Sequence, residues 1–523
     1  MSGTAFTMDT LIYAIGSHVM YFNKYNINGK RIWTKSFGGK SPNSFMIVNR
    51  MKCDDQGNVY MCGNLSPVAG DTIIIGNYRI PGRGAFIAKF NRNGDNIWCT
   101  VSEPSGITGS SATFYDMSVG INVLYTCGEM SFGKLKFGNR VFKNKFSNGA
   151  LVCGLNLING NVFTSRLLDT TSANQAFGIE VSKNNKVYVV GGYLGPGDFI
   201  VDALSVPFSN LNVNSFVLQT DLSLKGKWLI NGTTYTSTSG VTGSFKKALS
   251  QIELDRFDNI YATGNAPGDS TAFGNISFAH ETSTPYKQDL YVVKFTRTGV
   301  PVWIKPGRSR ENDFVNDIIT DPSGNSIIAV GSGENATGGL IFGNDTIPQR
   351  YSGLVKYDAA GNIIYTKALQ ESQSVKQMSS GPNGSFVITG NPFRRGRPFD
   401  TILINDCENK NNGSTAGNSM FMAGFAQTEI PLYAKTFPDK NLSKIIKVYP
   451  NPTAGLIQIS YPEMKKNETV SLSIFSRDNR LMIYKPAVDA NQVVDVSGLQ
   501  TGYYICHLQD RSGDQASVLL FKE

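Results

Sequence analysis

The sequence has few of the residues on which most catalytic and metal sites depend. Its 523 residues include three histidines, His18, His280 and His507, which fall in unrelated places. A Ser-His-Asp or Cys-His arrangement needs one of them beside a nucleophile. The sequence patterns of zinc proteases, serine hydrolases and phosphate-binding loops do not occur. The sequence therefore predicts no catalytic residue, no metal site and no cofactor.

Charged residues and helical patterns are also scarce. Asp, Glu, Lys and Arg make up 17% of the chain, whereas glycine occurs 54 times and aromatic residues contribute 11%. Long Ala/Glu/Lys/Leu runs at helical spacing are missing, so the composition favours an all-β, turn-rich protein. The net charge of +9 comes from scattered cations, the densest group being Arg394, Arg395 and Arg397. No interleaved aromatics indicate a nucleic-acid partner.

Further absences concern membranes and covalent cross-links. The seven cysteines lack the C-x-x-C spacing of metal sites, and an odd number cannot all pair within the chain. No run of about 18 apolar residues predicts a transmembrane helix. The first residues, MSGTAFTMDTLIYAIG, lack the basic and apolar regions of a signal peptide. We therefore expect neither a transmembrane segment nor a disulfide framework.

What the sequence does contain is a long repeat. A pentapeptide ending in glycine occurs as IYAIG, VYMCG, LYTCG, VYVVG, IYATG, IIAVG and FVITG. Later in each unit an aromatic residue recurs, and its first three intervals are each 65 residues. All four tryptophans belong to this column, so we predict that its members pack in the core of each unit: Trp33, Trp98, Phe163, Trp228, Trp303, Tyr365 and Tyr433.

Turns at fixed places join the strands of each unit. Asp opens a turn before the glycine strand, as in DDQGN at Asp54 and DPSGN at Asp321, and can cap its own backbone. Calcium binding is the alternative role, but these turns are shorter than an EF-hand loop. A second turn precedes the aromatic strand, as in NRNGD after Phe90. Because tight turns join antiparallel neighbours, each unit predicts a sheet of about four strands.

One such sheet cannot bury both faces alone, whereas sheets stacked around an axis can. We therefore predict a seven-bladed β-propeller over residues 1–437, since two or three β-sandwiches would not keep one aromatic in register seven times. The first unit is short, which indicates either a naturally trimmed blade or residues missing upstream of Met1.

The repeat resembles the seven-bladed β-propeller repeat family of bacterial secreted proteins. The shared elements are D-x-x-G-N-x-Y-V-x-G and K-[FLY]-x-x-x-G-x-x-x-W, which describe turns and packing. Four units carry the lysine of the second element, at Lys24, Lys89, Lys294 and Lys356. Two others are aligned with Asn156 and Thr220 at this place. The lysine is therefore not predicted to be a shared functional group.

The C-terminal tail follows a different pattern. Residues 438–443 (PDKNLS) predict a polar linker, and alternating stretches such as LIQIS and LSIFS predict a small β-sandwich over 444–523. The tail resembles the type A C-terminal sorting domain of the type IX secretion system through YPNPTAG, SRDNR, LQTGYY and the closing FKE, with Asn479 where the family usually has glycine. The motif residues are Tyr449, Pro450, Asn451, Pro452, Gly455, Gly502 and Tyr503.

This resemblance implies the partners and the location. It implies export by the type IX secretion machinery, and recognition of the tail, usually with removal, by a surface sortase. The protein is then expected in the extracellular space or on the outer-membrane surface of a Gram-negative bacterium. Such cargo also resembles Sec substrates, which carry an N-terminal signal peptide, so we expect the true start of the protein to lie upstream of Met1.

Four carboxylates on the expected innermost strands are the candidates for glycosidase chemistry: Asp116, Glu180, Glu253 and Asp317. Alignment by the turns places Lys52 in the column of Glu180 and Glu253, and Arg50 in that of Asp317. Opposite charges in one column fit a mixed, water-filled channel better than an acid pair. The sequence favours a non-enzymatic scaffold with a glycan or protein ligand on its loops. A polysaccharide-degrading enzyme (glycoside hydrolase or lyase) and a structural surface-layer component are the alternatives.

Overall fold

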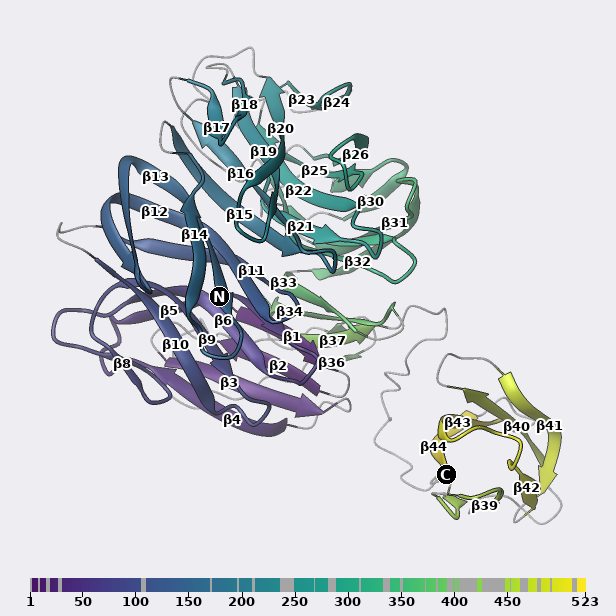
Figure 1. The fold of residues 1–523 in the computed structure, drawn as a ribbon. Helices are drawn as coiled ribbons and strands as arrows, with labels where there is room; N and C mark the ends of the chain where they lie inside the picture. Colours follow the sequence, from purple (N-terminus) through teal and green to yellow (C-terminus); the bar gives the residue numbers. More distant parts are fainter. Residues whose placement is uncertain are drawn as a thin grey trace. The chain divides into compact units, whose positions relative to one another are not determined.

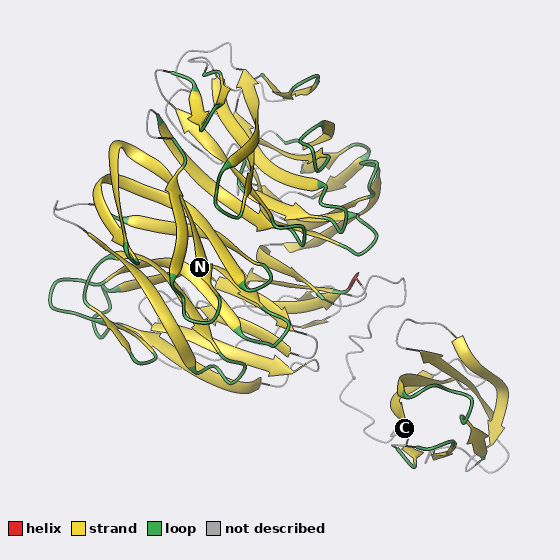
Figure 2. Cartoon of the chain, viewed as in Figure 1, coloured by secondary structure: helices red, strands yellow, loops and turns green. Residues whose placement is uncertain are grey.

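The computed structural model divides the chain into two compact units, Met1–Leu432 and Tyr433–Glu523. The described residues form strands, turns and loops without an α-helix, apart from a short 3₁₀ turn at Gly384 that is red in Figure 2, which confirms the predicted all-β class. Several predictions fall on residues that the structure does not describe. They are the boundary at 437, the linker 438–443, Tyr433, Pro452, His18, Asn479 and the group of Arg394, Arg395 and Arg397. The structure describes residues 2–7, 10–15, 19–26, 31–104, 110–169, 172–194, 197–208, 212–235, 249–267, 269–280, 288–309, 312–332, 339–348, 351–371, 373–381, 384–392, 398–399, 402–403, 421–425, 447–451, 453–460, 469–476, 481–489, 492–509 and 515–523.

The first unit is a series of antiparallel sheets that follow one another along the chain (Figure 1). The first sheets contain β1 (Ser2–Thr7), β2 (Thr10–Ile15), β3 (Val19–Asn26) and β4 (Arg31–Gly38); β5 (Phe45–Cys53), β6 (Val59–Ser66), β9 (Gly84–Phe90) and β10 (Asn96–Pro104); and β11 (Ala112–Val119), β12 (Val123–Phe137), β13 (Arg140–Asn156) and β14 (Val162–Leu167). The last two groups are joined at their outer edge, where the end of β12 pairs with β10.

The next sheets repeat this order. They contain β15 (Ala173–Val181), β16 (Lys186–Leu194), β19 (Asn212–Asp221) and β20 (Gly226–Tyr235); β21 (Gln251–Leu254), β22 (Ile260–Pro267), β25 (Gln288–Phe295) and β26 (Pro301–Gly307); β27 (Asp313–Thr320), β28 (Ser326–Ser332), β31 (Tyr351–Tyr357) and β32 (Ile363–Glu371); and β33 (Gln373–Ser380), β34 (Phe386–Pro392) and β37 (Phe421–Phe425). Because three strands of the last sheet are described, the count of seven complete four-stranded blades stays a prediction.

The first strands of these sheets form a closed ring. Each lies beside the first strand of the next sheet, and the two ends of the series meet where β33 lies beside β1. A ring of sheets with their first strands innermost is the arrangement of a β-propeller. It brings the inner edges of sheets far apart in sequence to one axis.

The apolar second strands are buried on both faces because each sheet packs between two others. In β6, Tyr60 and Cys62 join one cluster with the sheet of β11–β14, whereas Val59 and Met61 join another with the sheet of β1–β4. Successive side chains of a strand point to opposite faces. The continuous apolar runs before the repeated glycines therefore follow from two-sided burial.

Short hairpins connect neighbouring sheets at their outer edges. The hairpin of β7 (Ile73–Ile75) and β8 (Tyr78–Ile80) pairs with β4, and that of β23 (Ser270–Phe273) and β24 (Ile276–Ala279) pairs with β20. β29 (Leu340–Phe342) and β30 (Asp345–Ile347) form a hairpin that meets the preceding sheet through a bridge between Arg308 and Ile341. Two further hairpins are β17 (Phe199–Val201) with β18 (Leu204–Val206) and β35 (Pro398–Phe399) with β36 (Ile402–Leu403).

Strand register corrects the alignment of the aromatic column in one sheet. Trp98, Trp228 and Trp303 each follow a bulge and lie opposite Lys89, Gln219 and Lys294. In the third sheet Thr164 takes this place, opposite Gly154, and Phe163 is the preceding residue. A one-residue slip turns a side chain to the other face. Phe163 is accordingly 43% exposed, which contradicts its predicted place in the core.

Two other alignments shift for the same reason. The residues at the motif-lysine position are Gly154 and Gln219 rather than Asn156 and Thr220. In the sixth sheet Val330 pairs with Val315, just as Gly63 pairs with Val48, so Gly331 lies one residue beyond the repeated glycine position. Gln219 precedes Trp228 by the same nine residues that separate Lys89 from Trp98, so the spacing within the unit does identify it. In the third sheet the connection from Leu155 to Val162 is one residue longer than that from Phe90 to Asn96, which shifts the register without removing the pattern.

The second unit contains two small sheets. One has the order β38 (Lys447–Tyr449), β39 (Leu456–Ser460) and β42 (Val493–Asp495), and the other β41 (Leu481–Asp489), β40 (Thr469–Ser476), β43 (Gly502–Gln509) and β44 (Gln515–Lys522). Ile457, Val494, Leu472, Ile474 and Cys506 are buried in one core shared by both sheets. The predicted β-sandwich pattern of the tail agrees with this packing.

Candidate functional site

A bulge recurs in the innermost strands of the first unit. In β5, β11, β15, β27 and β33 the register shifts by one residue just before the position held by Arg50, Asp116, Gly178, Asp317 and Gln377. Gln251 of β21 has the equivalent place, because it pairs with Thr263 as Arg50 pairs with Cys62. Bulges re-aim side chains. Here they bring polar groups from separate sheets together near the axis.

Arg50 is the centre of this group. Its Nε lies 2.6 Å from Asp116 Oδ1, its Nη1 lies 3.0 Å from Asp317 Oδ1, and its Nη2 donates to Gln251. Burial opposes the charge on the guanidinium, but the two carboxylates outweigh this effect and raise the pKa of Arg50 above its ordinary value. The cation therefore links three other innermost strands.

Backbone amides engage the remaining oxygens of the two aspartates. Asp116 Oδ2 accepts a hydrogen bond from Ile179 N at 3.0 Å, and Asp317 Oδ2 accepts one from Met378 N at 2.7 Å. Both carboxylates are about 2% exposed. A buried ion pair satisfied in this way serves structure rather than proton transfer, since neither carboxylate has a free oxygen facing solvent.

A second ring of polar side chains lies two residues further along the same strands. Lys52, Ser118, Glu180 and Glu253 pair with Tyr60, Tyr125, Tyr188 and Tyr261, so the predicted common column of Lys52, Glu180 and Glu253 is confirmed. Lys52 Nζ lies 2.9 Å from Glu180 Oε1, and Ser118 Oγ donates to Glu180 Oε2 at 2.5 Å. The Lys52 side chain keeps 32% exposure, so this ring faces water.

Glu253 differs from the other acids of the axis. Burial and the nearby charge of Glu180 raise the pKa of Glu253 to about 8, and Lys52 opposes this shift only in part. Within the described part of the chain its carboxyl has no hydrogen-bond partner. Sequence alignment put Glu253 in the correct column, but the pKa shift depends on distances across the ring that no local pattern encodes.

The motif lysine and tryptophan have a shared structural role that the sequence did not indicate. Lys89 Nζ and Trp98 Nε1 both donate to Leu157 O, at 2.8 and 3.2 Å, in the turn of the next sheet. Lys294 Nζ and Trp303 Nε1 both donate to Ala359 O, at 2.7 and 3.2 Å. The lysine and the tryptophan therefore link one sheet to the next through hydrogen bonds to the same carbonyl oxygen. In the fourth sheet, where Gln219 replaces lysine, Trp228 Nε1 is buried without a partner.

The other aromatics of the column vary in burial. Trp98 and Trp303 are buried, whereas Trp33, Trp228 and Tyr365 are half-buried. Trp33 meets Phe22 edge-on at 4.8 Å between ring centroids. These side chains pack between sheets, and none of them lines the axial rings.

The Asp turns are capped as predicted. Asp54 Oδ1 accepts hydrogen bonds from Gln56 N and Asn58 N, and its Oδ2 accepts from Asn58 Nδ2. Asp255 and Asp321 make the same set within their own turns. The carboxylates are thus occupied by the protein itself. No cluster of three or more potential metal-ligating side chains occurs among the described residues.

In the second unit the two ends of the tail motif meet. Asn451 Oδ1 accepts a hydrogen bond from Phe521 N at 2.8 Å, and Thr453 exchanges backbone hydrogen bonds with Phe521 and Glu523. Tyr449 and Pro450 are exposed, and Gly455 N donates to Thr453 Oγ1. Gly502 has φ of 154°, and Tyr503 pairs with Phe521. The first and last segments of the motif therefore form one surface.

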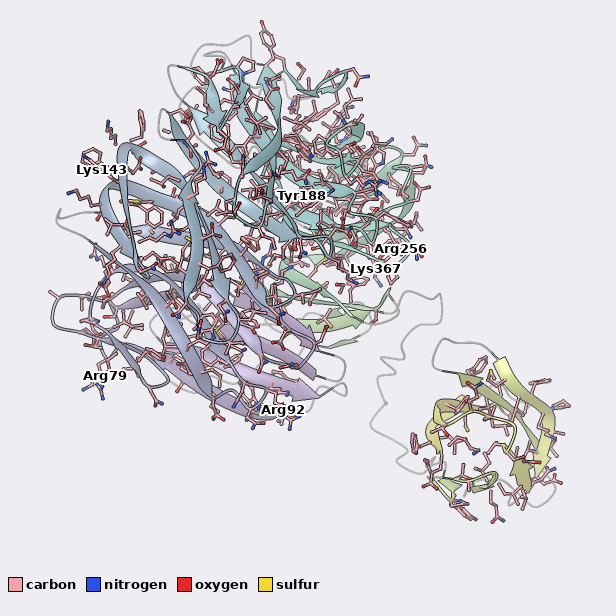
Figure 3. All side chains as sticks on the ribbon, viewed as in Figure 1. Arg79, Arg92, Lys143, Tyr188, Arg256 and Lys367 are labelled. Atoms are coloured by element: carbon pink, nitrogen blue, oxygen red, sulfur yellow. The ribbon has the colours of Figure 1, made fainter. Side chains whose placement is uncertain are left out.

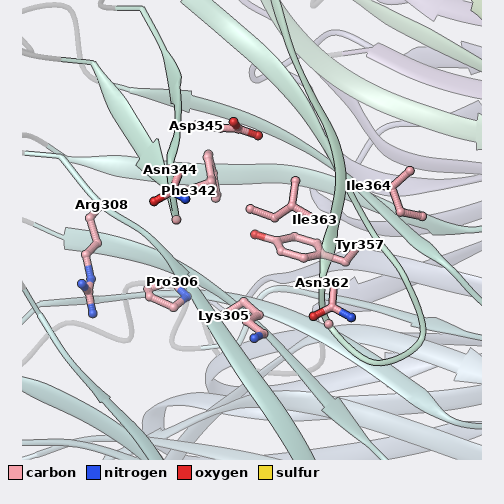
Figure 4. Close-up of a pocket in the computed structure, with 12 residues that line it drawn as sticks. Lys305, Pro306, Arg308, Phe342, Asn344, Asp345, Tyr357, Asn362, Ile363 and Ile364 are labelled. Carbon is pink, nitrogen blue, oxygen red and sulfur yellow. The ribbon is translucent and has the colours of Figure 1, made fainter.

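A separate pocket of about 560 Å³ lies at the outer part of the first unit (Figure 4). Its walls come from the end of β26, the hairpin of β29 and β30, and the turn between β31 and β32. Lys305, Arg308 and Asp345 are its charged lining residues, and Tyr357 lies on its floor. The sequence held no signal for this pocket, because its residues belong to different strands and turns.

Surface charge and thiols add no other centre. Arg79, Arg92 and Lys143 lie away from Arg256 and Lys367, which are labelled near each other, so these five cations do not form one patch in the view of Figure 3. The six described cysteines are unpaired, and burial raises the pKa of Cys53, Cys99 and Cys506 to about 12. No helix in the described ranges has both the length and the apolar character needed to cross a membrane.

Comparison with known proteins assigns the tail. Residues 447–521 match the family described as the secretion system C-terminal sorting domain. The predicted sorting domain is therefore confirmed, and it supports export to the cell surface by type IX secretion. No curated protein matches the chain.

Solved structures show remote similarity. Prolyl oligopeptidase B from Galerina marginata has 8% identity and a TM-score of 0.32, with coverage of 97% of this chain and 56% of its own. The chain thus spans little more than half of that enzyme's length. The extracellular domain of a putative one-component system from B. thetaiotaomicron has 10% identity, 99% and 86% coverage and a TM-score of 0.16. A xyloglucanase from Xanthomonas campestris has 8% identity, 77% and 83% coverage and a TM-score of 0.19. With all three TM-scores under 0.5, these similarities carry no argument about function.

Proposed function

We propose that the protein is a non-enzymatic binding scaffold, a β-propeller exported by type IX secretion and released or held at the surface of a Gram-negative bacterium. The match of residues 447–521 to a secretion sorting domain carries this proposal. The tail is of type A, and the surface formed by Asn451, Thr453 and the closing strand is the part that the secretion machinery and a surface sortase recognise.

The chemistry of the axis favours binding over turnover. Glycosidases use one carboxyl as acid and a second, free carboxylate as base or nucleophile. Asp116 and Asp317 are held by Arg50 and by backbone amides, and Glu180 is held by Lys52 and Ser118. These three carboxylates are thus engaged in structural contacts.

A polysaccharide-degrading enzyme is the second candidate, and Glu253 is the observation that favours it. A carboxyl with a raised pKa in a water-accessible ring is suited to general acid catalysis. A carboxyl pKa is also raised wherever several acidic side chains surround one lysine, and this is the simpler explanation here. A structural surface-layer component would bind no soluble ligand.

Two measurements test the proposal. Deleting residues 447–523 should leave the remaining chain in the periplasm of a type IX host, and appearance of the shortened protein at the surface would contradict the export assignment. A glycan and surface-protein array, run beside an assay for released reducing sugar, should give binding without turnover. Turnover that disappears in Glu253→Gln would establish the enzyme instead, and absence of every ligand would favour the surface-layer role.

A further inference from the structure

The pocket between β26 and the hairpin of β29 and β30 is lined by a tyrosine hydroxyl that has no hydrogen-bond partner among the described residues. Tyr357 is 1% exposed, yet it lies on the pocket floor. Figure 4 shows its phenol oxygen directed into the space between Phe342 and Pro306. Among the described residues, nothing accepts or donates a hydrogen bond to this oxygen. This oxygen is therefore available to a ligand or to water in the pocket.

The repeat shows that this hydroxyl is not required for packing. Tyr357 pairs with Ser326 at the position where β9 has Phe90 and β25 has Phe295. Both phenylalanines are fully buried. Two other sheets therefore fill the same site with a ring that lacks the oxygen, whereas β3 has Tyr25, β13 has Leu155 and β19 has Thr220 there. The packing position thus does not require the hydroxyl of Tyr357, which points into the pocket.

The floor of the pocket is held rigidly. The rings of Tyr357 and Trp303 lie 5.9 Å apart between centroids, and Trp303 Nε1 and Lys294 Nζ both donate to Ala359 O. Burial raises the pKa of Tyr357, so the phenol keeps its proton and can donate at neutral pH. A fixed donor in a preformed pocket loses little entropy when a ligand binds.

Two cations line the walls without an acidic partner. Lys305 Nζ makes no ion pair or hydrogen bond within the described residues, and its stem lies against Gly361. Arg308 donates through Nη2 to Ala279 O at 2.9 Å, and its Nε is buried without a partner. Asp345 is exposed and forms no ion pair with either cation. The two cations outnumber the single carboxylate, so the pocket favours a ligand that carries negative charge.

The remaining lining residues match one chemical class. Asn344 presents its side-chain amide to the pocket, and Asn362, whose Nδ2 already donates to Asp358 Oδ2 at 2.9 Å, lines it as well. Pro306 and Ile363 form an apolar strip. A hexuronic acid offers hydroxyls for amides and phenol, a carboxylate for the cations, and a ring face of C–H groups for the apolar strip. The volume of about 560 Å³ is in the range of ligand pockets and exceeds the need of a bare oxyanion.

We propose that this pocket binds a carboxylate-bearing sugar residue of an acidic glycan, with the Tyr357 hydroxyl and the Lys305 ammonium as its principal contacts. This inference rests on the proposed binding function and specifies its ligand class. It places the site at the outer junction of two sheets rather than at the axis.

The test compares uronic-acid oligosaccharides of two to four residues with their neutral counterparts, using the full chain and isothermal titration. We expect the acidic series to bind at least about tenfold more tightly than the neutral series. Tyr357→Phe should weaken binding of the acidic series about tenfold, the usual effect of losing one hydrogen bond from a charged or well-oriented contact. Lys305→Gln should remove most of the preference for the acidic series and reduce its dependence on salt.

Matched controls separate the pocket from general effects. Tyr261→Phe removes a phenol that donates to Gly324 O outside the pocket, and Lys35→Gln removes one positive charge from β4. Neither control should change binding. Circular dichroism should show that Tyr357→Phe folds, since phenylalanine is native at the equivalent positions of β9 and β25.

Each contrary outcome is informative. Glycan binding that both pocket variants leave unchanged would overturn this site while keeping the proposed binding function. Equal affinity for acidic and neutral series, or equally tight competition by inorganic sulfate or phosphate, would overturn the ligand class. Absence of all saccharide binding would also overturn the inference, and the proposed function would then depend on whether any protein on the array binds. Binding only of acidic peptides would overturn it as well.

Discussion

At the scale of single residues, Arg50 has the largest structural role in the first unit. Its guanidinium reaches Asp116 in one neighbouring sheet and Asp317 and Gln251 in sheets further around the ring. The aspartates stay buried because this cation and the backbone amides satisfy them. The sequence placed Arg50 and Asp317 in one column, but only the closed ring brings their side chains into contact.

Removing this cation should be strongly destabilising. Arg50→Met leaves two buried carboxylates without a counter-charge, so we expect the free energy of unfolding to fall by about 3–5 kcal/mol. Urea unfolding followed by tryptophan fluorescence measures the change. The control is Lys35→Met, which breaks an exposed pair with Asp95 and should cost less than about 1 kcal/mol. Equal losses in both variants would show that the axial ion pairs are no more important than surface pairs.

Because of Glu253, the free energy of unfolding should decrease as the pH rises from about 4.5 to 8. Its pKa in the folded protein is raised from 4.5 to about 8. Below pH 4.5 the carboxyl is protonated in both the folded and the unfolded chain, so no difference arises. As the pH rises toward 8, only the unfolded chain ionises this group freely, and the free energy of unfolding falls.

Glu253→Gln should remove that dependence. We expect the variant to exceed the wild type by about 2 kcal/mol at pH 8 and to equal it near pH 4. Chemical unfolding at several pH values measures the difference. Glu103→Gln, which changes a side chain that is 67% exposed, is the control and should follow the wild type. A Glu253→Gln variant that loses stability at pH 8 would mean that the ionised carboxylate stabilises the ring.

At the scale of the strand, register decides which face a side chain occupies. Phe163 shares the 65-residue spacing of Trp98 and Trp228, yet it precedes the aligned position, which Thr164 holds. The spacing of the aromatic residues is regular, but the turn in the third sheet is one residue longer than in the others, and the spacing alone does not show this. By contrast, the Asp turns were predictable, because a cap within five residues depends only on local geometry.

A tryptophan that donates a hydrogen bond to the next sheet should contribute more to stability than one that only packs there. Trp98→Phe removes a donor to Leu157 O, and we expect a loss of about 1–2 kcal/mol beyond the volume effect. Trp228→Phe is the matched control, because Trp228 Nε1 is buried without a partner. Thermal unfolding of both variants gives the comparison. Equal losses would assign the role of Trp98 to packing alone.

The closing strand of the tail should depend on the start of its motif. Asn451→Ala removes the side-chain acceptor of Phe521 N, so we expect the amide of Phe521 to exchange hydrogen about five- to tenfold faster. Hydrogen-exchange mass spectrometry of the full chain measures this. Asp495→Ala, which affects a local turn at Ser497, is the control. Unchanged exchange at Phe521 in Asn451→Ala would show that the two motif ends are held together by other contacts.

At the scale of the whole molecule, the ring explains why function is hard to read from the repeat. Each sheet buries both faces against its neighbours, so the repeated residues are largely committed to packing, turns and contacts between sheets. The positions that differ between blades remain available for ligands. Tyr357 illustrates this, since its oxygen, at a position where β9 and β25 have phenylalanine, makes the pocket floor polar.

The sequence by itself determined the all-β class, the order of strands and turns, and the sorting domain of the tail. Each of these depends on alternation, turn chemistry or a contiguous motif, which are local properties. Only the tertiary structure decided the partners of Arg50, the raised pKa of Glu253, the exposure of Phe163 and the pocket around Tyr357. Those depend on strand register and on closure of the ring, which bring together residues from different sheets. Neither has a local signal in the chain.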